Sequence, residues 1–199
     1  MKKALPVILF FSLASMGYAD FKIMGGFNLS KYRVSGGNEE LEWNNKPGFA
    51  AGLGFERNLN PLLLVEFNVL YFKKGSKVKS AADASQWTYN LNVVSVPVLF
   101  RSKFLYDSSP YVVAGVEFSF ITSHQVKSGD LEPLDIKDRT QSFDFGLVFG
   151  GGFELKLQDR LFLFVEGRYQ LGIRNIVNDP SDPQSRKTKA LLILVGVRS

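Results

Sequence analysis

The most constraining feature of this sequence is the strict alternation of residue type between Leu161 and Arg174, LFLFVEGRYQLGIR. Side chains in a β-strand point to opposite faces in turn, so this segment forms a strand with an apolar face and a polar face. Other segments repeat the pattern, with large apolar residues on one face and charged residues, Asn or Gly on the other. A polar face of that kind would make a poor hydrophobic core. The pattern therefore favours a β-barrel whose apolar side faces lipid.

The first residues of the chain predict export. Lys2 and Lys3 precede an apolar run, and Gly17-Tyr18-Ala19 places small residues where a signal peptidase cleaves. We therefore expect residues 1–19 to be a signal peptide and residues 20–199 to form one barrel domain. The alternative, a retained anchor helix, is disfavoured because the run is shorter than the roughly 20 residues needed to span a bilayer.

Composition excludes several classes of function. The formal net charge is +5, and loss of the two signal lysines would lower it further, so the charge does not suggest a nucleic-acid partner. The sequence has no cysteine, which excludes disulfides, thiolate metal sites and cysteine nucleophiles. We expect no cofactor.

Eight segments have the alternation and the length expected of membrane-crossing strands. They lie at residues 21–33, 48–59, 62–75, 87–105, 110–125, 141–157, 161–175 and 188–198. The connections alternate between tight turns and loops of about a dozen residues, the long ones near 34–47, 76–86, 126–140 and 176–187. The expected fold is thus all-β, an eight-stranded antiparallel up-and-down transmembrane barrel, with its long loops outside the cell.

The strand at 87–105 changes phase within itself. Tyr89, Leu91 and Val93 occupy one set of alternate positions, whereas Val94, Val96, Val98 and Phe100 occupy the other. An extra residue near Val93-Val94 would restore a single apolar face, so we predict a β-bulge there.

Charged residues on the inward phases predict an ion-paired lumen. Eight strands enclose a space that side chains nearly fill, so a wide pore is excluded, and an isolated buried charge would cost several kcal/mol. The expected network comprises the carboxylates Glu56, Glu66, Glu117, Asp144, Glu154 and Glu166 and the cations Lys22, Arg101, Arg168 and Arg174. A narrow ion path through this network is the functional alternative to a structural plug.

The order of several segments makes the resemblance to a known family specific. They are GGFN, GFAAGLGFE, YFKKGS, YNLNVVSVPVLFRSKF, PYVVAGVEFSF, FDFGLVFGGGFEL and FVEGRYQLGIRNI. In this order they resemble the PorT-like outer-membrane β-barrel family of Bacteroidetes over essentially residues 20–199. The resemblance implies an outer-membrane barrel without catalytic residues, and some members of that family support the export of other proteins. One departure is the C-terminus, Val197-Arg198-Ser199, where many outer-membrane barrels end on an aromatic residue.

An enzyme site at the rim would have to use His124, the only histidine, with Ser123, Ser128 and Asp130 nearby. A lipid-modifying enzyme of this kind is one alternative. No nucleophile motif accompanies these residues, and we predict no catalytic residues. One histidine and scattered carboxylates match no metal-ligand pattern, so no metal site is predicted.

Lysines cluster where the strand at 62–75 would leave the membrane. Lys73, Lys74, Lys77 and Lys79 could contact the phosphate groups of lipopolysaccharide, with Arg186, Lys187 and Lys189 adding to the same basic zone. Aromatic residues would form interfacial girdles. At the rim with the long loops these are Trp43, Trp87, Tyr89 and Tyr71, and at the other rim Phe21, Tyr106 and Tyr111.

The main rival architecture is a soluble lipocalin-like barrel with a ligand inside. It would require the apolar faces to point inward, where eight sets of Leu, Phe, Val and Ile would overfill the interior. The sequence therefore predicts a non-enzymatic outer-membrane barrel with a structural or interaction role. Its expected partners are outer-membrane lipid, lipopolysaccharide and envelope proteins, among them those of a secretion system.

Overall fold

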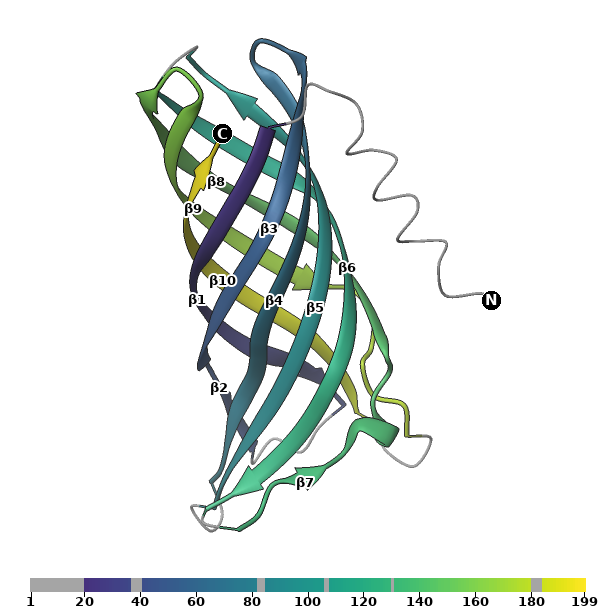
Figure 1. Cartoon of the computed structure of the whole chain (residues 1–199). Helices are drawn as coiled ribbons and strands as arrows, with labels where there is room; N and C mark the ends of the chain where they lie inside the picture. Colours follow the sequence, from purple (N-terminus) through teal and green to yellow (C-terminus); the bar gives the residue numbers. More distant parts are fainter. Residues whose placement is uncertain (1–19, 37–40, 82–84, 106–107, 130, 180–183) are drawn as a thin grey trace, which may run out of the picture.

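The computed structural model describes residues 20–36, 41–81, 85–105, 108–129, 131–179 and 184–199. The expected signal peptide, residues 1–19, lies outside these ranges. Eight long strands dominate the described part of the chain (Figure 1). They are β1 (Asp20–Ser35), β3 (Lys46–Asn60), β4 (Leu63–Ser80), β5 (Gln86–Lys103), β6 (Ser109–Ser128), β8 (Phe143–Gln158), β9 (Leu161–Gly172) and β10 (Ser185–Arg198). Two short strands, β2 (Leu41–Asn44) and β7 (Leu134–Asp135), and the 3-10 helix η1 (Lys137–Arg139) lie in the connections.

The long strands close into an antiparallel barrel. Each pairs with its neighbour in sequence, β6 pairs with β8, and β1 pairs with β10 along fourteen residue positions from Lys22↔Arg198 to Ser35↔Ser185. The short strands extend the wall rather than interrupt it, since β2 pairs with the end of β4 and β7 with the end of β6. The predicted eight-stranded up-and-down barrel is therefore confirmed.

An apolar belt covers the outside of the barrel. Along β1 the outward residues Phe21, Ile23, Phe27 and Leu29 are about half exposed or more, while the alternate residues are buried in the interior. Outward residues such as Phe100, Phe149 and Ile193 continue the belt on other strands. A soluble barrel would expose polar groups here, so this face is built for lipid and the lipocalin-like alternative is wrong.

The interior contains apolar layers that the alternation did not predict. Met24, Leu70, Phe72, Phe164 and Leu192 belong to one buried cluster in the lumen. A second cluster lies toward the end with the long connections and comprises Tyr32, Leu91, Val93, Ile121 and Ile176. The lumen is therefore packed by apolar as well as charged side chains.

Two glycines of β8 lie where a Cβ atom would not fit. A Cβ atom at Gly152 would lie 2.6 Å from the hydroxyl oxygen of Tyr111, and one at Gly150 would lie 2.1 Å from the carbonyl oxygen of Gly167. Substitution at either position requires neighbouring atoms to move, so a side chain is excluded by space rather than by backbone conformation.

The predicted long loop at 76–86 is mostly strand. β4 continues to Ser80 and β5 begins at Gln86, and the two remain paired as far as Lys79↔Gln86. Ser76 donates a hydrogen bond to the carbonyl of Asn44, which attaches β2 to this extension. At the bottom of Figure 1, β4, β5 and β6 consequently reach beyond the rest of the barrel. Residues 60–63, by contrast, form a tight turn in which Asn60 Oδ1 accepts hydrogen bonds from the amides of Leu62 and Leu63, at 2.9 and 2.8 Å.

The β-bulge lies at the predicted level of the barrel, but on the neighbouring strand β6 instead of on β5. Asn92 pairs with Ser123 and Val93 with Ile121, so the extra residue is Thr122 of β6. β5 keeps one phase throughout, which turns Leu91 and Val93 into the lumen rather than toward lipid. The prediction of an inserted residue in β5 is wrong because these side chains find apolar partners inside the barrel.

Within the described residues, no helix is long and apolar enough to cross a membrane.

Candidate functional site

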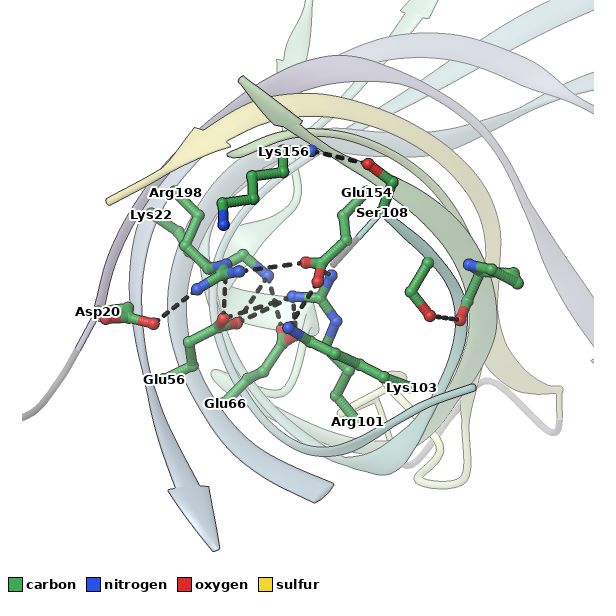
Figure 2. Close-up of polar contacts among 12 residues, drawn as sticks. Asp20, Lys22, Glu56, Glu66, Arg101, Lys103, Ser108, Glu154, Lys156 and Arg198 are labelled. Carbon is green, nitrogen blue, oxygen red and sulfur yellow. Dashed lines mark hydrogen bonds and ion pairs between the residues drawn. The ribbon is translucent and has the colours of Figure 1, made fainter. Parts of the chain in front are cut away.

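The lumen near the tight turns holds a network of buried charges (Figure 2). All the long strands except β6 contribute through their inward phase, and the side chains of most members are fully buried. The members are Lys22, Glu56, Glu66, Arg101, Lys103, Glu154, Glu166, Arg168 and Arg198. We call this set the lower lumen network.

Arg101 of β5 is the central cation of the lower lumen network. Its guanidinium lies 3.0 Å from Glu56, 3.5 Å from Glu66 and 2.6 Å from Glu154. It also stacks on the Tyr111 ring, with 3.6 Å between the guanidinium carbon and the ring centre. One residue thus joins carboxylates from three other strands and fixes their relative positions.

The remaining cations complete the pairing. Lys22 Nζ lies 3.0 Å from Glu66, and Lys103 Nζ lies 2.5 Å from Glu154. Arg168 pairs with Glu166 on its own strand and reaches Glu66 across the lumen at 3.4 Å. Because each charge faces an opposite one, the cost of burying it is offset.

Arg198, the penultimate residue, ties the last strand to this network. Its guanidinium lies 2.6 Å from Asp20, 2.9 Å from Glu56 and 3.4 Å from Glu154. Figure 2 shows these contacts reaching from β10 to β1 and β3. The strand β10 is therefore held to β1 by ion pairs as well as by the backbone hydrogen bonds between the two strands.

A second, smaller polar cluster lies on the other side of the apolar layer. Lys74 Nζ contacts Glu117 at 3.0 Å, and the Ser119 hydroxyl donates to the same carboxylate at 2.6 Å. Asp144 accepts a hydrogen bond from Thr188 at 2.7 Å. Of the six predicted carboxylates, Glu117 and Asp144 thus stand apart from the lower lumen network.

Two predicted charged residues are placed elsewhere than expected, and the predicted girdle residues Tyr89 and Tyr111 face the lumen instead of the membrane interface. Arg174 follows the end of β9, is exposed, and donates to Gln141 at 3.3 Å, so its prediction as a lumen cation is wrong. Lys74 was grouped with the lipid-contacting lysines, but it is 2% exposed and points into the lumen. It lies on the inward phase of β4, whereas Lys73, Lys77 and Lys79 lie on the outward phase and are exposed.

Sequence reasoning missed Lys103 and Arg198. Lys103 is two residues beyond Arg101 and therefore on the same face, a signal that the sequence already contained. From the sequence alone, Arg198 is only part of an unusual C-terminus. Its role depends on the closure of β10 against β1, which only the three-dimensional structure supplies.

His124 is a hydrogen-bonded side chain at the end of the lumen with the long connections. The Thr140 hydroxyl donates to the carbonyl of Ile136, so it accepts from the Nδ1–H of His124 at 2.7 Å. Nε2 then accepts from the Tyr32 hydroxyl at 3.0 Å. Both ring nitrogens are thus hydrogen-bonded to protein groups, and the His124 side chain links β6 to Tyr32 of β1 and to Thr140.

The other residues of the predicted rim site do not converge on His124. Ser128 is four residues further along β6, about 13 Å away at the rise of a strand. Asp130 lies outside the described residues, and Ser123 is half-buried beside the bulge. In the part of the chain that the structure describes, no group of three or more His, Asp or Glu side chains could hold a metal ion.

A small pocket of about 200 Å³ opens beside His124 at this rim. Tyr89, Arg139, Thr140, Asp179 and Arg186 are among the residues that line it. Arg186 stacks over Trp43 and Tyr89, at 5.8 and 5.9 Å from the ring centres, and Arg139 pairs with Asp179 at 3.9 Å. The lining of the pocket is thus polar, and it includes the ion pair between Arg139 and Asp179.

Comparison with known proteins places the chain in a family. Residues 12–178 match the family model described as outer membrane protein beta-barrel domain. The chain belongs to this outer membrane β-barrel family. This family assignment and the lipid-facing belt locate the protein in the outer membrane.

Solved structures of outer-membrane proteins align with this chain at low sequence identity. The outer membrane protein OprG from Pseudomonas aeruginosa aligns with a TM-score of 0.54 and 16% identity, covering 91% of this chain and 95% of OprG. Neisserial surface protein A aligns with a TM-score of 0.49 and 15% identity, covering 89% and 95%. The attachment invasion locus protein Ail of Yersinia pestis aligns with a TM-score of 0.47 and 13% identity, covering 92% and 99%. No curated protein sequence matches the chain.

Proposed function

We propose that this outer-membrane barrel is a non-enzymatic structural or interaction component that works through its outer surfaces rather than through its lumen. The observation that supports this most is the packing of the interior, where the lower lumen network, an apolar layer around Phe72 and Phe164, and a second apolar cluster around Tyr32 follow one another. A barrel filled in this way transports nothing without unfolding its own core.

The extracellular extension of β4, β5 and β6 is the surface that we propose for interaction. Lys73, Lys77 and Lys79 project from the outward face of β4, just beyond the apolar belt. Lys73 Nζ lies 5.2 Å from the ring centre of Phe49, at the boundary between belt and extension. Phosphate groups of lipopolysaccharide suit these three lysines as partners, because phosphates at a membrane surface attract nearby cations.

A sharper form of the proposal is a supporting role in protein secretion. Its basis is the PorT-like order of segments, in particular YNLNVVSVPVLFRSKF and FVEGRYQLGIRNI. Under this proposal the extension contacts a secretion protein as well as lipid. In-cell cross-linking from Lys79 and Lys127, both exposed on the extension, would test it by recovering an envelope protein of a secretion system. Recovery of lipid alone would contradict the secretion role and leave the structural role.

Planar bilayer recording tests the proposal that the lumen does not transport. We expect no stepwise conductance from the wild-type barrel. The matched variant Phe72→Ala/Phe164→Ala removes two rings from the apolar layer and is expected to admit ions intermittently. Steady conductance by the wild type would favour the alternative of a narrow channel.

A lipid-profile assay separates this proposal from a rim-located enzyme. Under this proposal His124 only holds Tyr32 and Thr140 in place, so cells that express His124→Ala should have the same outer-membrane lipid composition as cells that express the wild type. A change in acylation or headgroup that depends on His124 would contradict the non-enzymatic proposal.

A further inference from the structure

Four cations lie side by side where the first and last strands close the barrel. In the register of β1 with β10, Lys31 is opposite Lys189 and Arg33 is opposite Lys187. Directly opposed side chains on neighbouring antiparallel strands have Cβ atoms about 5 Å apart, and like charges in that position destabilise the pair. The chain therefore places two repulsive pairs in succession on one face of one seam. We call these four residues the seam cations.

Among the described residues, no carboxylate forms an ion pair with a seam cation. The buried acids of the described residues, such as Glu56 of β3 and Glu154 of β8, face the lumen, whereas the seam cations face outward. Arg33 is exposed and the other three are half-buried, so they remain accessible from outside the barrel.

The seam cations sit at the edge of the lipid-facing belt. Leu29 and Leu191, which are opposite each other, are 46% and 47% exposed and end the belt on this seam. Lys31 and Lys189 are the next outward residues on the two strands, and Arg33 and Lys187 follow one step further out. At this level the apolar chains of a lipid end and its phosphate groups begin, on the side of the membrane with the long connections.

A hollow in the outer surface joins the belt to the first pair of cations. It has a volume of about 230 Å³. Among the residues that line it are Leu29, Lys31, Asn45, Tyr169, Lys189 and Leu191. Apolar and aromatic side chains form one part of the lining and two ammonium groups and an amide form the other. This is the arrangement that an acyl chain with a phosphate at its head requires.

We propose that the seam cations and this hollow form a binding site for a phosphorylated glycolipid, the lipid A part of lipopolysaccharide. Lys31 and Lys189 contact one phosphate group, Arg33 and Lys187 contact further anionic groups outside it, and an acyl chain lies against Leu29, Leu191 and Tyr169. The bound phosphate neutralises the two repulsive pairs across the β1–β10 seam. This inference deepens the proposed lipopolysaccharide contact and rests on it, but it assigns the specific site to the seam rather than to the lysines of β4.

Binding to purified barrel in detergent micelles tests the site. The probes are bisphosphorylated lipid A, dephosphorylated lipid A and phosphatidylglycerol. The seam variant is K31Q/R33Q/K187Q/K189Q, and the comparison variant K73Q/K77Q/K79Q neutralises the outward lysines of β4. Arg160→Gln, in the exposed turn at the opposite rim, is the control for loss of a surface charge.

We expect the seam variant to bind bisphosphorylated lipid A at least tenfold more weakly than the wild type, and the β4 variant to lose less than threefold. Wild-type affinity for dephosphorylated lipid A should be similarly reduced. A loss confined to the β4 variant would overturn the seam site and leave the proposed lipopolysaccharide contact standing. No binding of lipid A by the wild type would overturn both. Equal binding of phosphatidylglycerol and lipid A would overturn the assignment to a glycolipid.

Thermal unfolding gives a readout that does not depend on a successful binding assay. In micelles without lipid A, the seam variant should be as stable as the wild type or more stable, because the opposed like charges are gone. Addition of bisphosphorylated lipid A should raise the unfolding temperature of the wild type and not that of the seam variant, since a ligand stabilises the state that binds it. Equal stabilisation of both proteins would contradict the proposal.

Discussion

Arg101 is the residue on which the lower lumen network depends most. Its guanidinium contacts Glu56, Glu66 and Glu154, each of which is fully buried, and it stacks on the ring of Tyr111. The stability that such a cation provides is measured less by its own pairs than by the carboxylates left uncompensated when it is removed.

Arg101→Met is therefore expected to destabilise the barrel by about 3–5 kcal/mol, the usual cost of breaking a buried ion pair from one side. Urea titration of the barrel folded into lipid vesicles, followed by the gel shift between folded and unfolded forms, measures this change. Arg160→Met, at an exposed turn, provides the control and should change stability by less than about 0.5 kcal/mol. Equal effects of the two variants would show that the buried pairs contribute no specific stability.

Arg198 allows a second prediction at this scale. Because it contacts Asp20, Glu56 and Glu154, Arg198→Gln should weaken the fastening of β10 to β1 and increase hydrogen exchange at both strand ends. Hydrogen exchange read by mass spectrometry should show the increase at residues 20–24 and 194–199 and little change in β5 and β6. A uniform increase around the barrel would contradict a local role.

At the scale of a single strand, the bulge at Thr122 determines which side chains of β6 point into the lumen beyond residue 122. Ile121 and His124 both point inward although they are three positions apart, which an uninterrupted strand does not permit. The extra residue reverses the phase and brings His124 against Tyr32 and Thr140.

Deletion of Thr122 should consequently remove the bulge and leave Ile121 and His124 both inward, because the two residues are then two positions apart in a regular strand. Limited proteolysis is expected to cut residues 129–142 at a similar rate in the deletion variant and in the wild type. Thr122→Ala is the matched control, because it removes only the hydrogen bond from the threonine hydroxyl to the carbonyl of Asn92, 3.1 Å long. Much faster cleavage of the deletion variant than of Thr122→Ala would contradict the assignment of Thr122 as the extra residue.

For the whole molecule, the closed sheet and the filled lumen together predict resistance to detergent. All the long strands have two neighbours, so no strand edge is open to unfolding from the side. The folded protein should migrate differently from the boiled protein on a gel and shift to the unfolded position only on heating. Recovery in the outer-membrane fraction without any heat-dependent shift would contradict a barrel of this stability.

The sequence by itself determined the barrel. The period-two alternation in eight segments fixed the number of strands, and their phases assigned Glu56, Glu66, Glu154, Glu166 and Arg168 to the lumen, because each depends only on the pleat of one strand. The tertiary structure decided what those strands place together across the barrel. In the folded barrel, Glu117 and Asp144 lie apart from the lower lumen network. Arg174 lies outside the lumen, and Lys74 points into it. The bulge lies on β6 instead of β5. The tertiary structure also paired Lys31 with Lys189 at the closing seam. These outcomes depend on register and on packing between strands far apart in sequence, and the alternation within one strand contains no information about its partner's register.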